Sequence, residues 1–186
     1  TTTYLATTAK SRLVTVKCLD ARKSANPRSV AAFVDRTRLA TRFDHPALLR
    51  VVDSGTSDGC LYIAFDHVPG VSLSRLLARV VDRGAHVPAD ILVRVALDVL
   101  AALGYAHGLC DSDGRSLEIV HRDVSPENVI LGFDGHTRLD ESSLVRTRVS
   151  RVTTETGVVR GRFAYLAPEQ AAGEPVDARA DLFSLA

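Results

Sequence analysis

Residues 121–128 read His-Arg-Asp-Val-Ser-Pro-Glu-Asn, and this stretch constrains the chain more than any other. It places a carboxylate, Asp123, five positions before a carboxamide, Asn128. A carboxylate can orient a hydroxyl group and accept its proton, and an amide oxygen can bind a hard metal ion. Because Asp, Ser, Pro and Asn also favour ordinary turns, the interpretation depends on the motifs that lie on either side.

Three further motifs lie in a consistent order around this loop. Residues 14–17 read Val-Thr-Val-Lys, residues 167–169 read Ala-Pro-Glu, and residues 181–184 read Asp-Leu-Phe-Ser. Together with residues 121–128 they resemble the protein kinase family, in particular its bacterial serine/threonine kinases. The resemblance covers essentially the whole chain.

The resemblance implies an α+β, two-lobed protein kinase-like fold. We expect an N-lobe over residues 1–68, with a small antiparallel β-sheet and one helix, and a mainly helical C-lobe over residues 69–186. The chain begins at Thr1, contains no Met and stops at Ala186, inside an expected helix. We therefore expect a segment of a longer protein, without the glycine-rich loop in front and the later helices behind.

Hydrophobic periodicity and turn residues predict the individual elements. The expected strands and helices are a strand over 12–17, a helix over 29–43, strands over about 48–54 and 60–66, and helices over 73–83 and 88–107. The last of these helices is apolar on several sides, which predicts that it is buried. The Pro69-Gly70 pair predicts a hinge between the lobes.

Composition excludes several classes of partner. A net charge of +1 argues against a nucleic-acid partner. The chain shows no signal peptide pattern, and no apolar run approaches the roughly 18 residues of a membrane span. The three cysteines form no C-x-x-C pair, so we expect no zinc but thiols in a reducing cytoplasm. The expected partner is a protein substrate or regulator, with no membrane contact from this segment.

The resemblance implies a role for each polar residue of the cleft. Lys17 would bind the α- and β-phosphates of ATP. Asp123 would be the catalytic base and Asn128 a ligand of Mg²⁺.

The resemblance also implies an adenine site at the end of the strand over 60–66 and in the linker that follows it. Phe65 would close the back of this site, the backbone at Asp66 and Val68 would receive adenine, and Ile130 would pack beneath the ring.

One departure from the kinase pattern falls on the helix over 29–43. Kinases carry a Glu there that pairs with the strand lysine, and alignment places Arg36 at its position. Arg36 cannot pair with Lys17, because like charges repel. Asp35 is adjacent, but one residue turns a helix position by about 100°. Either Asp35 substitutes through a twisted helix or the ion pair is absent, and we favour its absence.

A second departure falls thirteen residues after Asn128, where kinases carry the metal-binding Asp-Phe-Gly. The sequence there is Glu141-Ser142-Ser143. Glu141 keeps a carboxylate and is our expected second Mg²⁺ ligand, but it is one methylene longer, which weakens the expected metal site. Asp140 comes one residue early, and on a strand it would point to the other face.

Residues 144–166 would form the activation segment. Thr153, Thr154 and Thr156 are candidate phosphorylation sites, and a polar mobile loop is the alternative. In the family, Glu169 pairs with an arginine of a later helix. Asp181 would accept hydrogen bonds from the backbone of the catalytic loop.

The retained residues predict an ATP-dependent protein serine/threonine kinase of a signalling pathway. The two departures support an alternative, a pseudokinase that binds nucleotide and acts as a regulatory or scaffolding module. A third possibility is a small-molecule phosphotransferase, which can share the Asp-to-Asn spacing. The Ala-Pro-Glu segment argues against it.

Overall fold

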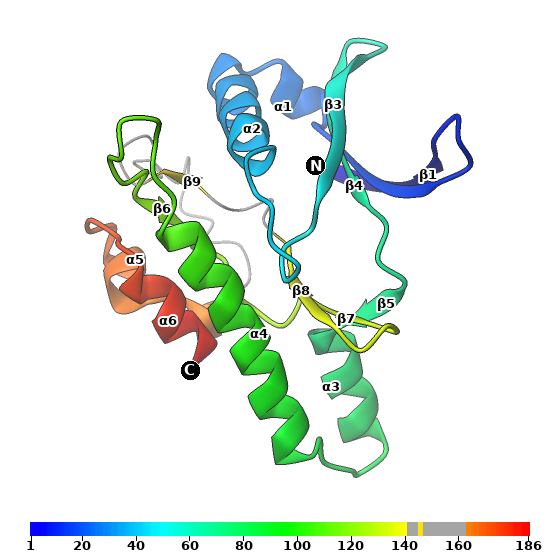
Figure 1. Cartoon of the computed structure of the whole chain (residues 1–186), viewed down its shortest axis with the longest axis vertical. Coiled ribbons are helices and arrows are strands. Elements are labelled where there is room, and N and C mark those ends of the chain that lie inside the picture. The colour runs from blue at the N-terminus through cyan, green and yellow to red at the C-terminus, as the bar shows by residue number, and fades with distance from the viewer. Residues whose placement is uncertain (141–144, 147–162) are drawn as a thin grey trace.

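The computed structural model describes residues 1–140, 145–146 and 163–186. Figure 1 shows a β-rich part, formed by the start of the chain, above a mainly helical part that contains the C-terminus. The α+β class and the small antiparallel sheet of the first part are confirmed. The lobe boundary between residues 68 and 69 stays a prediction.

The first part contains a four-stranded antiparallel sheet in the order β1-β2-β4-β3. Its strands are β1 (Thr2–Thr7), β2 (Leu13–Cys18), β3 (Val51–Ser57) and β4 (Cys60–Asp66). The predicted hairpin between β3 and β4 is confirmed, with Ser57 opposite Cys60. Asp58 and Gly59 have φ values of 50° and 75°, as a two-residue turn that follows the twist of its strands requires.

Two helices follow β2, the short α1 (Ala21–Ser24) and α2 (Pro27–Ala40). The start of α2 is set by Asn26, whose side chain accepts hydrogen bonds from the backbone N–H groups of Arg28 and Ser29 at 2.9 and 3.4 Å. A cap of this kind, with Pro at the first helical position, is a strong start signal.

The segment after α2 attaches the β-rich part to the helical part. The backbone N–H of Leu139 donates to the carbonyl of Ala47 at 2.8 Å. The His45 and Tyr105 rings stack with centroids 5.1 Å apart, and the N–H of Asp44 donates to the Tyr105 hydroxyl at 3.0 Å. The segment that follows α2 is therefore held by both a strand and a helix of the second part.

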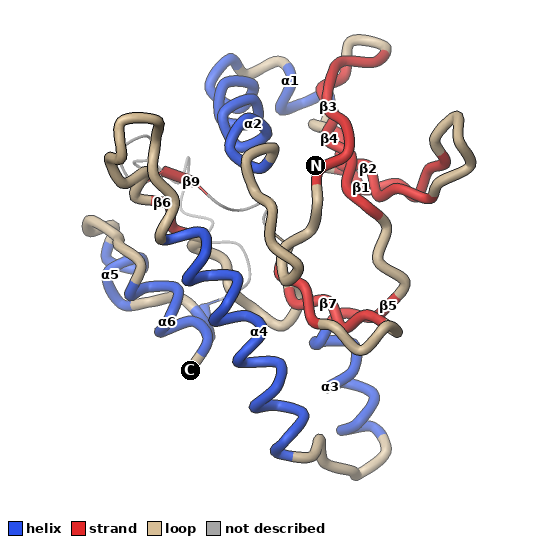
Figure 2. Tube along the Cα trace, in the orientation of Figure 1, coloured by secondary structure: helices blue, strands red, loops and turns tan. Residues whose placement is uncertain are grey.

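The second part mixes helices with short strands (Figure 2). Its elements are β5 (Gly70–Ser72), α3 (Leu73–Asp82), α4 (Ala89–His107), β6 (Ile119–Val120), β7 (Val129–Gly132), β8 (Thr137–Leu139), β9 (Val145–Arg146), the 3-10 helix η2 (Phe163–Tyr165), α5 (Pro168–Ala172) and α6 (Arg179–Leu185). The strands form one sheet in the order β5-β7-β8 and a second sheet of β6 and β9.

Helix α4 is buried on one face only. Its core residues are Val95, Val99, Ala102, Leu103 and Ala106, whereas Ile91, Leu92, Val93, Leu97 and Leu100 are exposed. The prediction of burial on several sides is therefore wrong, because within the described ranges no element covers the second face. None of the helices that the structure describes combines the length and hydropathy needed to cross a membrane.

Candidate active site

The loop over residues 121–128 is anchored by the fully buried carboxylate of Asp181 in α6. This carboxylate accepts hydrogen bonds from the backbone N–H groups of His121 and Arg122 at 2.8 and 2.7 Å. The predicted role of Asp181 is confirmed. Nε2 of His107, at the end of α4, lies 2.7 Å from the same carboxylate. Sequence reasoning missed His107, although a His that closes a long helix shortly before the loop was a usable signal.

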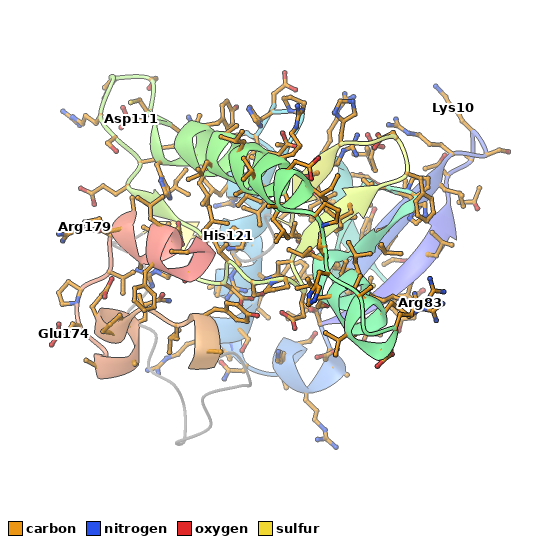
Figure 3. The ribbon with its side chains drawn as sticks, turned by 90° about the horizontal axis from the view of Figure 1, so that it is seen from below. Lys10, Arg83, Asp111, His121, Glu174 and Arg179 are labelled. Atoms are coloured by element: carbon orange, nitrogen blue, oxygen red, sulfur yellow. The ribbon has the colours of Figure 1, made fainter. Side chains whose placement is uncertain are left out.

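His121 is buried and bonded at both ring nitrogens. In Figure 3 it lies in the interior beside α6. Its Nε2 donates to the carbonyl of Asp140 at 2.8 Å, and its Nδ1 accepts the backbone N–H of Asp123 at 3.3 Å. Burial lowers the pKa of His121, against an opposing effect of Asp181. The imidazole is therefore neutral, with its proton on Nε2.

Asp123 and Asn128, the two residues that opened the sequence argument, are brought together. The Asn128 side-chain nitrogen donates to the Asp123 carbonyl at 2.7 Å and to its carboxylate at 2.9 Å. Because these bonds use the nitrogen of the carboxamide, its oxygen is oriented away from Asp123. One loop thus presents both a proton-accepting carboxylate and an amide oxygen.

Lys17 forms an ion pair with Asp140, 123 positions further along the chain. Lys17 comes from β2, and Asp140 directly follows β8. Both side chains are largely buried, with 14% of each side-chain surface exposed. The carboxylate that meets the strand lysine therefore comes from the second part of the chain.

The expectation that Asp140 points away from the cleft is wrong. Strand β8 ends at Leu139, whose side chain is buried in the core. The next residue therefore faces the opposite side, towards Lys17. The backbone fixes this register, because Val129 pairs with Leu139 and the N–H of Asp140 donates to the Asn128 carbonyl at 2.9 Å. Counting thirteen residues from Asn128 could not reveal it.

The predicted adenine site lies along the end of β4 and the linker after it. Phe65 is fully buried, and Nζ of Lys17 lies 5.4 Å from the centroid of its ring. The backbone N–H of Asp66 donates a hydrogen bond to the backbone carbonyl of Arg50 at 2.9 Å. Val68 and Ile130 are partly buried and pack against the hydrophobic core. These residues stay predictions as adenine contacts.

Arg36, which the sequence comparison with kinases places at the Glu position, lines the same small cavity as Lys17. The residue as a whole keeps a large exposed area, but the surrounding protein desolvates its guanidinium and lowers the pKa of Arg36. Its neighbour Asp35 is exposed.

Several predicted positions lie outside the described residues. They are Glu141, Ser142, Ser143, Thr153, Thr154 and Thr156. Their roles stay predictions, and so does the partner expected for Glu169.

Comparison with known proteins agrees with this geometry. The protein kinase domain family matches residues 1–186, the whole chain. The chain belongs to the protein kinase family.

Curated relatives are bacterial kinases. The chain is 35% identical to the tyrosine-protein kinase MasK of Myxococcus xanthus and 33% identical to the serine/threonine-protein kinase PknL of Mycobacterium bovis. Each match covers 94% of this chain but only 27% and 41% of the relative. The chain therefore spans well under half the length of these relatives.

A solved structure shares the fold. The crystal structure of the PknI kinase domain from Mycobacterium tuberculosis matches with a TM-score of 0.69 and 31% identity, over 98% of this chain and 64% of the PknI chain. The kinase-like fold expected from the sequence is confirmed.

Proposed function

We propose that this chain is the ATP-binding and phosphoryl-transferring part of a protein kinase that modifies Ser or Thr residues of other proteins. The observation that carries the proposal is the ion pair between Lys17 and Asp140. It lies beside the catalytic loop, because the carbonyl of Asp140 accepts the His121 hydrogen bond. A cation and an oxygen ligand are thus placed next to a proton acceptor, as phosphoryl transfer requires.

The donor set fits ATP and Mg²⁺, on which protein kinases rely. Mg²⁺ prefers carboxylate, amide and phosphate oxygens, and the carboxylate of Asp140 and the amide oxygen of Asn128 are of this kind. In the proposal they hold the metal, with Glu141 as the further predicted ligand. When bound, Mg²⁺ neutralises charge on the phosphates.

The remaining residues bind, orient and move a proton. Lys17 holds the phosphates, and the linker residues Phe65, Asp66 and Val68 hold adenine together with Ile130. Asp123 orients the attacking hydroxyl and accepts its proton. Its carboxylate is positioned for this role by the Asn128 hydrogen bond.

Arg36 favours a second candidate, a nucleotide-binding pseudokinase. A helix without its carboxylate cannot fix the strand lysine in the usual manner, so binding could persist while turnover is lost.

Replacing one lysine tests the proposal. The full-length protein is incubated with γ-labelled ATP and a generic basic protein, and the phosphorylated residue type is identified. Lys17→Met should lower phosphate transfer at least 100-fold, because the phosphates lose their cation. Lys10→Met is the control, since Lys10 lies exposed in the turn between β1 and β2 (Figure 3). Nucleotide binding without transfer by the wild type would select the pseudokinase, and transfer to Tyr would contradict the Ser/Thr assignment.

A further inference from the structure

A small cavity of about 140 Å³ lies between helix α2 and strands β2 and β4. Half of the residues that line it are apolar, namely Phe33, Ala40, Ile63 and Phe65. The two charged residues that line it, Lys17 and Arg36, are both cations. No acidic residue lines this cavity in the described part of the chain.

The two cations differ in how their charge is compensated. Lys17 has Asp140 as its partner. Among the residues that the structure describes, no carboxylate forms an ion pair with Arg36. Burial lowers the pKa of Arg36, but the ordinary arginine value lies so far above neutrality that the guanidinium keeps its charge. The wall of the cavity therefore carries a partly desolvated positive charge next to the lysine assigned to phosphates.

We propose that Arg36 is a second phosphate-binding cation of the nucleotide site, which allows the protein to bind ADP or ATP without a divalent metal ion. This inference rests on the proposed function, because it requires nucleotide phosphates to lie beside Lys17. A guanidinium binds phosphate oxygens through two parallel N–H bonds. It therefore supplies charge that the metal ion would otherwise supply. Helix α2 then contributes a residue that binds the ligand directly. In other kinases the Glu at this helix position instead orients the strand lysine.

The proposal is tested by measuring the Kd values of ADP, pyrophosphate and adenosine for the full-length protein, by calorimetry, in EDTA and in Mg²⁺. Arg36→Leu should weaken ADP and pyrophosphate binding in EDTA about tenfold or more, the usual scale for losing a hydrogen bond to a charged group. Adenosine affinity should not change, because adenosine carries no phosphate. Arg36→Lys should restore part of the loss, since it keeps the charge but not the paired geometry.

Arg38→Leu is the matched control. Arg38 is exposed on the same helix, two positions further on. Its substitution should leave the affinities for ADP, pyrophosphate and adenosine unchanged. Thermal melting shows whether each variant folds, and Arg36→Lys provides the test if Arg36→Leu does not fold.

The two possible failures are distinguishable. If adenosine and ADP bind but the Arg36 variants keep the wild-type ADP affinity in EDTA, the role of Arg36 is refuted and the nucleotide site stands. If the wild type binds neither adenosine nor ADP, the proposed function fails, and this inference fails with it.

Discussion

The Nε2 atom of His121 donates a hydrogen bond to the backbone carbonyl of Asp140 at 2.8 Å. This bond joins the catalytic loop to the residue whose carboxylate meets Lys17. A neutral imidazole is required, because Nδ1 of the same ring accepts the N–H of Asp123. The position of Asp140 therefore depends on the protonation state of one buried histidine.

Acidification should destabilise the protein through His121. Burial lowers the pKa of His121 in the folded state, whereas the unfolded value is about 6.5. Above pH of about 6.5 both states are neutral, and this contribution to stability is fully present. Below that pH the unfolded state binds the proton first, so the free energy of unfolding decreases, by about 1.4 kcal/mol for each unit of pKa difference.

Urea unfolding between pH 7.5 and 5.5 checks this prediction. His121→Asn should make the pH dependence shallower, although the variant is less stable at neutral pH. His86→Asn, in an exposed loop, should keep the wild-type slope. An identical slope for His121→Asn and wild type would contradict the prediction.

Asp123→Asn should remove phosphate transfer while keeping the shape of the loop. The amide cannot accept the proton of the attacking hydroxyl, and the loss of such a base typically costs 10²–10⁴-fold in rate. Labelled phosphate incorporation measures the effect, with Asp113→Asn in an exposed loop as the control. Wild-type activity in the Asp123 variant would show that another group is the base.

Two amide substitutions test which carboxylate is the main Mg²⁺ ligand. We expect Asp140→Asn to raise, at least tenfold, the Mg²⁺ concentration at which half of the Mg²⁺-dependent gain in ADP affinity is reached, because a charged oxygen ligand is lost. Glu141→Gln should have a smaller effect if Asp140 is the main ligand. Titrating Mg²⁺ at fixed ADP measures both. The reverse order of effects would restore Glu141 as the main ligand.

Removing the Asp181 carboxylate should strongly destabilise the fold. Asp181→Ala leaves the buried N–H groups of His121 and Arg122 without their acceptor. An unsatisfied buried donor costs about 1–3 kcal/mol, so the expected loss in unfolding free energy is about 3 kcal/mol or more. Asp82 is exposed at the end of α3, so Asp82→Ala should change the free energy of unfolding by less than about 0.5 kcal/mol. Chemical denaturation distinguishes the two, and equal effects would contradict the anchoring role of Asp181.

Local signals in the sequence were sufficient for most of the longer elements. The turn-rich stretch over 54–59 located the β3–β4 hairpin, although β3 continues to Ser57, and the helices expected over 73–83 and 88–107 appear with nearly the same bounds. Strand β1 was not expected, because its residues are exposed and lack a hydrophobic alternation. It forms through pairing with β2, which no local pattern shows.

The part of the candidate site that lies within one loop could be predicted from the sequence. The contact between residues from distant parts of the chain could not. Asp123 and Asn128 meet because they are close in sequence. The partnership of Lys17 and Asp140 depends on where β8 ends and on the packing of Leu139, both of which are tertiary properties. Spacing alone therefore selected Glu141.

The stacking of His45 on Tyr105 anchors the segment just after the C-terminal end of α2. With a rise of about 1.5 Å per residue, the first turn of α2 lies about 20 Å from Ala40 and Arg36 only about 6 Å from it. A rotation of about 10° around that end would move the first turn by about 3.5 Å and Arg36 by about 1 Å. Arg36 therefore stays closer to its place beside Lys17 in any such rotation than the first turn of α2 does.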